Sequence, residues 1–135
     1  MAATIINYGS MSGLIDGQRL KAGGIDSPFS FTVGGQKHET TWSIANGASA
    51  IIYANSLGSF NTVAIECDYN TRIVVTDTGS NVLSLGIRGT GISGKYGLPF
   101  QLTLGTTLNA STTINSIVVH NASGSTAKVH AIVIK

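Results

Sequence analysis

The chain has 135 residues, of which only 10% are charged, and its formal net charge is +2. A chain of this length is typical of one domain and can bury about two-thirds of its unfolded surface. It has no run of about 18 apolar residues and no basic stripe with interleaved aromatic residues, so we predict neither a membrane span nor a nucleic-acid partner. Its 15 Ile, 15 Thr, 9 Val and 17 Gly residues are typical of strands and turns.

The N-terminal stretch, MAATIINYGSMSG, lacks the positively charged region and the long apolar core of a signal peptide. The lone cysteine, Cys67, cannot form a disulfide within the chain. Both observations predict a protein that is made and assembled in the cytoplasm.

Residues 1–8 have two interpretations. They form either an extended arm that adds a strand to a neighbouring subunit or the first strand of the chain's own sheet. In the first case we expect interface residues at Thr4, Ile5, Ile6 and Tyr8.

The glycine-containing region 9–27 does not show strand alternation. Its best helical segment runs from Leu14 to Ala22, and Gly17 weakens that helix. The pattern changes at residue 29, where alternating apolar residues predict a strand over 29–33.

Turn signals then separate short alternating strands. Asn46-Gly47 is a strong hairpin signal between strands predicted at 40–45 and 48–54, because both turn positions need a positive φ. Asn70-Thr71 separates the next two predicted strands in the same way, although less strongly.

The clearest alternation covers residues 62–69 and predicts a strand with one buried face. The inward residues are Val63, Ile65, Cys67 and Tyr69, and the outward residues are Thr62, Ala64, Glu66 and Asp68. Cys67 is therefore expected to be a small buried hydrophobe.

The string IVVTDTGSNVL at 73–83 resembles the aspartic-protease signature, which implies a catalytic Asp77 paired with the same residue of a second copy. Only 58 residues follow Asp77, and they contain no match to the later hydrophobic-hydrophobic-Gly segment of that family. Ordinary hairpin chemistry between strands at 72–76 and 81–87 is favoured, with Asp77 bonding its own backbone and Gly79 at positive φ. A homodimeric protease stays as a remote alternative.

Residues 88–98, RGTGISGKYGL, are predicted to form a long flexible loop. Gly89 to Gly94 fit G-x-G-x-x-G, but a dinucleotide fingerprint must open a helix, and no helical pattern follows. The next alternating segment predicts a strand over 99–104.

Two last strands, near 113–120 and 126–134, flank a polar turn. The segment Val129 to Ile134 is apolar on both faces, which predicts a central strand or one covered by a partner chain. The sequence as a whole predicts an all-β, antiparallel β-sandwich of nine or ten short strands, jelly-roll-like, in a single domain over 1–135.

The three histidines, His38, His120 and His130, lack metal-ligand spacing, although the strands of the last two could be adjacent. The chain also lacks a Gly-x-Ser-x-Gly elbow and a catalytic cysteine signature. We therefore expect no metal, no cofactor and no enzymatic activity.

A carbohydrate- or receptor-binding module, such as a fibre knob or a lectin-like domain, is the alternative function. Its aromatic platform would come from Trp42 or Tyr96. Trp42 shares a face with Ile44, so core packing is favoured there, and Tyr96 in the glycine-rich loop is the better exposed candidate.

The predicted surface is polar but weakly charged, because its outward positions are mostly Ser, Thr, Asn, Gln and Gly. Soluble monomers usually carry more charge, since charge prevents association. The composition therefore predicts a homo-oligomer.

This character, together with a Met-started chain that ends in STAKVHAIVIK, resembles small structural proteins of tailed bacteriophages, of the head-decoration, cement or short-fibre type. The resemblance implies an oligomer, often a trimer, in the virion. It implies binding to the major capsid protein or another virion protein, and stabilisation of the shell by added interface area.

Overall fold

The computed structural model describes residues 3–7, 10–15, 18–23, 29–33, 37–58, 60, 62–103 and 114–134. The chain divides into two compact units, Met1–Gln36 and Lys37–Lys135. Within the described residues, no helix is long and apolar enough to cross a membrane.

The larger unit is an antiparallel β-sandwich with one short 3-10 helix, η1 (Asn55–Leu57). It has eight strands, not the nine or ten expected, and it occupies Lys37–Lys135. Its strands are β5 (Lys37–Ile44), β6 (Ser49–Ala54), β7 (Thr62–Cys67), β8 (Thr71–Asp77), β9 (Val82–Ile87), β10 (Phe100–Thr103), β11 (Ile114–His120) and β12 (Ala127–Ile134).

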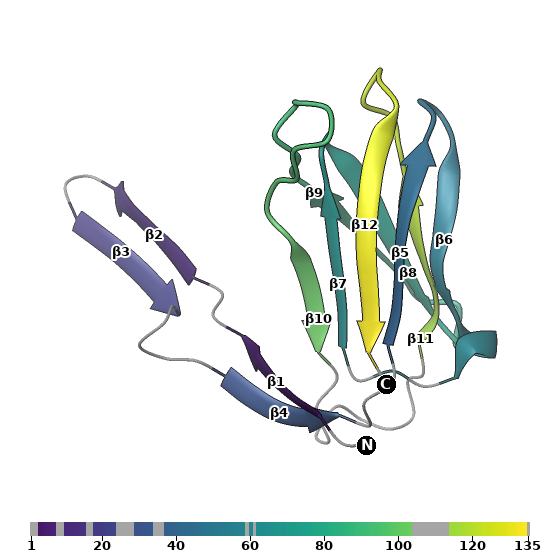
Figure 1. Ribbon diagram of the computed structural model, residues 1–135, viewed down its shortest axis with the longest axis horizontal. Coiled ribbons are helices and arrows are strands. Elements are labelled where there is room, and N and C mark those ends of the chain that lie inside the picture. Colours follow the sequence, from purple (N-terminus) through teal and green to yellow (C-terminus); the bar gives the residue numbers. More distant parts are fainter. Residues whose placement is uncertain are drawn as a thin grey trace. The chain divides into compact units, whose positions relative to one another are not determined.

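The strand order is that of a jelly roll. One sheet has the order β10-β7-β12-β5 and the other β6-β11-β8-β9 (Figure 1). The first strand of the sandwich pairs with its last, the second with the seventh, the third with the sixth and the fourth with the fifth. This is a long hairpin rolled into two sheets, so the all-β, jelly-roll-like prediction is confirmed.

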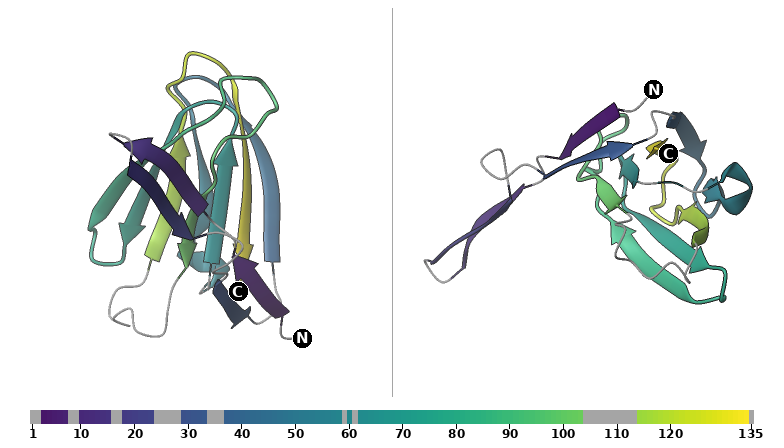
Figure 2. Two further views of the ribbon diagram at one scale, coloured as in Figure 1. Left: turned by 90° about the vertical axis from the view of Figure 1, so that its left-hand side faces the viewer. Right: turned by 90° about the horizontal axis from the view of Figure 1, so that it is seen from below.

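Figure 2 shows the sandwich in two further views. Alternating apolar side chains form the core between its two sheets. Strand β12 is central in its sheet, as its apolar sequence predicts. Cys67 is buried, and burial raises the pKa of its thiol. The core residues are Ile44, Ile52, Tyr53, Phe60, Val63, Ile65, Cys67, Ile73, Val75, Ile87, Ile117, Val119, Val129, Ala131 and Val133.

The Asn46-Gly47 turn does not close a hairpin. Gly47 has the expected positive φ of 81°, but β5 and β6 belong to different sheets. The turns after β7 and β11 also connect the two sheets. A local turn signal shows where the chain reverses, but it does not show whether the two strands pair, because pairing depends on strands distant in sequence.

The turn between β8 and β9 is a true hairpin, as expected. The backbone N–H and the side-chain amide of Asn81 donate to the two carboxylate oxygens of Asp77, each at 2.8 Å. These hydrogen bonds lower the pKa of Asp77. The positive φ in this turn belongs to Ser80, at 65°, and not to Gly79 as predicted.

The smaller unit consists of two two-stranded antiparallel sheets. β1 (Ala3–Asn7) pairs with β4 (Phe29–Val33), and β2 (Ser10–Ile15) pairs with β3 (Gln18–Gly23). The weak helical pattern over Leu14 to Ala22 therefore does not lead to a helix within the described residues. The sequence between the ends of β2 and β3 is Asp-Gly, a strong hairpin signal that outweighs the weak helical pattern.

Asn121 lies at the start of the turn between β11 and β12. We expect its replacement to destabilise the sandwich. Its buried amide donates to the carbonyl oxygens of Ile44 and Ser125, each at 2.7 Å, and its oxygen accepts from the N–H of Ser123. We expect Asn121→Ala to lower the free energy of unfolding by about 2–4 kcal/mol, since buried backbone groups lose their partners. Urea denaturation followed by the fluorescence of Trp42 measures this change.

Asn46→Ala is the matched control, because the exposed Asn46 side chain accepts only one hydrogen bond, from the N–H of Gly124. Its expected cost is below about 1 kcal/mol. Equal losses in the two variants would contradict this role of Asn121.

Candidate functional site

Four connections meet at one end of the sandwich. They are residues 45–48, 68–70, 88–99 and 121–126, which follow β5, β7, β9 and β11, and they lie together at the top of Figure 1. Backbone hydrogen bonds tie them to one another, for example from Gly47 N to Asn121 O at 2.7 Å and from Gly91 N to Asp68 O at 2.8 Å. We call this the loop end of the sandwich.

Asp68 is the polar centre of the loop end. The sequence places it on the outward face of a strand over 62–69, but β7 ends at Cys67, and Asp68 turns inward and is fully buried. Its two carboxylate oxygens accept backbone N–H groups from Gly94 and Lys128, each at 2.7 Å. One buried carboxylate thus connects the long loop after β9 to the start of β12.

The long loop over 88–99 lies directly against the 68–69 turn. A Cβ atom on Gly89 would lie 2.4 Å from the backbone carbon and oxygen of Asp68, and a Cβ on Gly97 would lie 2.2 Å from the carbonyl oxygen of Arg88. Gly97 N–H donates to Cys67 O at 2.9 Å. The loop is therefore held by close backbone contact, in contrast to the flexible loop that the sequence predicts.

A cavity of about 660 Å³ opens at this end. Its lining carries two arginines and a histidine but no carboxylate side chain. The residues that give it chemical character are Tyr69, Asn70, Arg72, Arg88, His120 and Ser123. Because its volume falls in the range of ligand pockets, it is the candidate site of this chain.

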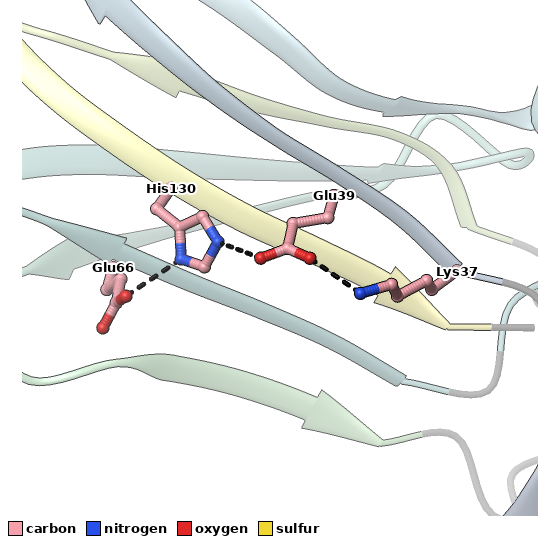
Figure 3. Close-up of polar contacts among 4 residues, drawn as sticks. All are labelled: Lys37, Glu39, Glu66 and His130. Atoms are coloured by element: carbon pink, nitrogen blue, oxygen red, sulfur yellow. Dashed lines mark hydrogen bonds and ion pairs between the residues drawn. The ribbon is translucent and has the colours of Figure 1, made fainter. Parts of the chain in front are cut away.

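A second polar cluster lies on the outer face of the sheet β10-β7-β12-β5 (Figure 3). His130 Nδ1 is 2.9 Å from Glu66 Oε1, and His130 Nε2 is 2.9 Å from Glu39 Oε1. Lys37 Nζ donates to Glu39 Oε2 at 2.9 Å. The cluster bridges β5, β12 and β7, three neighbouring strands of that sheet.

Both ring nitrogens of His130 face carboxylates, which favours the imidazolium. The hydrogen bond to Glu39 is the main cause that raises the pKa of His130, and the hydrogen bond from Lys37 is the main cause that lowers the pKa of Glu39. Since both nitrogens are occupied, His130 has no lone pair for a metal. The described residues contain no group of three or more side chains that could hold a metal ion.

The residues singled out from the sequence do not converge on one site. Trp42 is half-buried and packs against the core, and Tyr96 is half-buried with its ring 5.9 Å from the His130 ring. His120 and His130 lie in different sheets, so they are not neighbours. Asp77 accepts hydrogen bonds within the β8–β9 turn. It does not line the cavity, and the cavity lining contains no other carboxylate.

The N-terminal interface candidates Thr4, Ile5 and Ile6 lie in β1, paired with Thr32, Phe31 and Ser30 of β4. Tyr8 lies outside the residues that the structure describes. The first strand therefore pairs within its own chain, which was the second interpretation of this segment.

Arg72, Arg88 and Asp68 have no signal in the sequence that marks them as a site. Arg72 and Arg88 are single cations at strand ends, separated by 15 residues of chain. They come together only because β8 and β9 form a hairpin and the loop after β9 folds back over the 68–70 turn.

Comparison with known proteins gives little further information. No family model and no curated protein matches the chain. A chain from a solved structure of Bacillus endospore appendages, described as a novel family of disulfide-linked pili, is similar with a TM-score of 0.44 and 16% sequence identity. The similarity covers 73% of this chain and 82% of that chain, and we draw no functional argument from it.

Replacing Gly89 should disturb the loop end. We expect Gly89→Ala to lower the free energy of unfolding by about 1–3 kcal/mol, because its Cβ would overlap the backbone of Asp68. Gly86→Ala in β9 is the control, since a Cβ there has nothing within 4 Å. Urea denaturation should show a change below about 0.5 kcal/mol for the control, and equal effects of the two variants would refute the close contact.

The His130 cluster should make stability depend on pH. A raised pKa means that the contribution of His130 is complete below its unfolded value of 6.5 and is lost as the pH rises through the folded pKa. The contribution of Glu39, whose pKa is lowered, is lost instead as the pH falls through its folded pKa. The gap in urea midpoint between the native protein and His130→Gln should therefore be larger at pH 6 than at pH 9, and a gap that grows with pH would contradict the cluster.

Proposed function

We propose that this chain is a non-enzymatic structural subunit that works as a homo-oligomer. The observation that supports this most is the form of the N-terminal unit. Each of β1, β2, β3 and β4 pairs with a single partner strand among the strands that the structure describes, so each has one unpaired edge. A two-stranded sheet is marginally stable in water by itself, and it gains stability when another strand is added.

The sequence of this unit fits such strand addition. Its strands carry apolar residues on β1, β2 and β4, at Ile5, Ile6, Met11, Leu14, Ile15, Phe29, Phe31 and Val33. Charged residues, which protect natural edge strands from association, are found only in β3, as Arg19 and Lys21. The unit is therefore suited to pairing with other copies.

The sandwich also has little charge to oppose association. The four strands of the sheet β6-β11-β8-β9 carry only two charged residues, Arg72 and Asp77. Ile51 and Val82 on this sheet are each 64% exposed. Weak repulsion and exposed apolar groups both favour packing against copies or a larger surface.

The more specific proposal is decoration of the outside of a tailed-bacteriophage capsid. The support for it is the combination of a jelly-roll domain, a separate N-terminal unit and a weakly charged surface. In this role the chain would stabilise the shell by contacts that exist only in the assembled state, and no catalysis is needed.

Light scattering after size exclusion tests the oligomer. We expect the native chain to elute as a single closed oligomer at micromolar concentration. The double variant Ile5→Lys/Ile6→Lys puts a cation on each face of β1 and should shift the mass toward the monomer. Thr78→Lys, in the exposed β8–β9 turn, is the control and should keep the native mass, and a monomeric native chain would refute the proposal.

Electron microscopy tests the location. An antiserum raised against the purified chain should label the heads of phage particles induced from the organism that encodes it. Labelling of tails or of filaments that are not phage would overturn the capsid assignment while leaving the oligomer intact.

A further inference from the structure

The loop-end cavity brings together positive charge that the rest of the fold does not use. Arg72 in β8 is exposed and lies directly across from His120 of β11, and Arg88 follows the last residue of β9. Neither arginine side chain forms an ion pair or hydrogen bond within the described residues. Two arginines that line one cavity and have no partners among the described residues favour an anion there.

The carboxylate nearest in sequence forms no ion pair with them within the described residues. Asp68 precedes cavity residue Tyr69, but it is fully buried, and its two oxygens accept the N–H groups of Gly94 and Lys128. No Asp or Glu is among the residues that line the cavity. A ligand carboxylate or phosphate would therefore meet no lining side chain that carries a negative charge.

The rest of the lining suits a polar ring rather than a bare ion. At about 660 Å³ the cavity is far larger than one inorganic anion needs, and it falls in the range of small-ligand pockets. Tyr69 supplies a half-buried aromatic side chain, while Asn70 and Ser123 supply amide and hydroxyl groups. Aromatic faces with nearby hydrogen-bonding groups suit the alternating apolar and hydroxyl surfaces of sugars.

His120 adds a further group. Its Nδ1 lies 2.5 Å from Ser49 Oγ, while Nε2 makes no hydrogen bond within the part of the chain that the structure describes. His120 is a lining residue of the cavity, so this nitrogen adds a hydrogen-bonding group that we assign to a ligand there.

The walls are fixed before any ligand arrives. Gly89 and Gly91 line the cavity, and the loop that carries them is held by the N–H of Gly89 on Asn70 Oδ1 at 3.0 Å and by Gly91 N–H on Asp68 O. A site that is already ordered loses less entropy when it binds.

We propose that the loop-end cavity is a binding site for an anionic saccharide. The carboxylate or phosphate of the sugar would lie between Arg72 and Arg88, and its ring would lie at Tyr69. This site is independent of the oligomer proposed above, and it uses none of the aromatic residues, Trp42 and Tyr96, that the sequence suggests for sugar binding.

Titration of the full-length chain, followed by NMR amide shifts, tests the site. The probes are glucuronic acid and glucose 6-phosphate, with glucose, inorganic phosphate and acetate as comparisons. We expect one or both anionic sugars to shift the amides of residues 68–72 and 88–91, and glucose to bind at least tenfold more weakly. The affinity should fall as salt is added.

Matched variants locate the binding. Arg72→Gln and Arg88→Gln should each weaken the sugar at least tenfold, because each removes a charge-assisted pair of hydrogen bonds. Lys128→Gln, an exposed cation on the other sheet, removes the same charge and should change the affinity less than twofold. The fluorescence of Trp42 confirms that each variant is folded.

Three results would overturn the proposal. Inorganic phosphate or acetate that binds as tightly as the sugars would show a site for a free anion. Binding of a single-stranded oligonucleotide in preference to both sugars would assign the cavity to nucleic acid. Absence of any shift at 20 mM sugar, or unchanged affinity in both arginine variants, would show that this cavity is not a saccharide site.

Discussion

The sandwich depends on how its cross-sheet turns satisfy their backbone hydrogen bonds. Each of the four connections at the loop end crosses from one sheet to the other, so its N–H and C=O groups have no neighbouring strand. Buried groups of this kind must find partners, since an unsatisfied donor or acceptor costs about 1–3 kcal/mol. Two buried side chains, Asp68 and Asn121, provide these partners, one for each pair of connections.

The hydrogen bonds of Asp68 and Asn121 hold the connections of the loop end in place, and these connections give the cavity its shape. Asp68 fixes the long loop after β9 against β12, and the close approach of Gly89 leaves no room for that loop to slide. The oxygens of the buried Asp68 carboxylate already accept backbone N–H groups, so they form no ion pair with Arg72 or Arg88 within the described residues. The same contacts that stabilise the turns therefore separate a structural negative charge from a positive one that is open to a ligand.

The two units of the chain suggest different tasks. The sandwich has a filled core between two four-stranded sheets, whereas the described strands of the N-terminal unit form only two-stranded sheets, which are marginally stable by themselves. A division into an assembling segment and a displayed domain is consistent with the structural role that we propose. The loop-end cavity that we propose for an anionic saccharide lies in the sandwich.

The sequence by itself determined the class of the fold and much of its local form. Period-two alternation placed strands close to their observed bounds, as at 29–33 and in the apolar final strand, because a sheet with a buried face leaves that pattern in every strand. It also identified Cys67 as buried and Asp77 as a turn residue. It could not show that Asn46-Gly47 crosses between the two sheets instead of closing a hairpin, since this signal describes only a reversal of the chain.

Only the tertiary structure decided what lies at the loop end. Asp68 is buried because β7 ends two residues earlier than the alternation indicates, and its partners Gly94 and Lys128 are 26 and 60 residues away. Arg72, Arg88 and His120 share a cavity because the rolled hairpin brings three separate segments to one edge. Such a site consists of residues that are ordinary in their own strands, so its character depends on long-range pairing that no local pattern encodes.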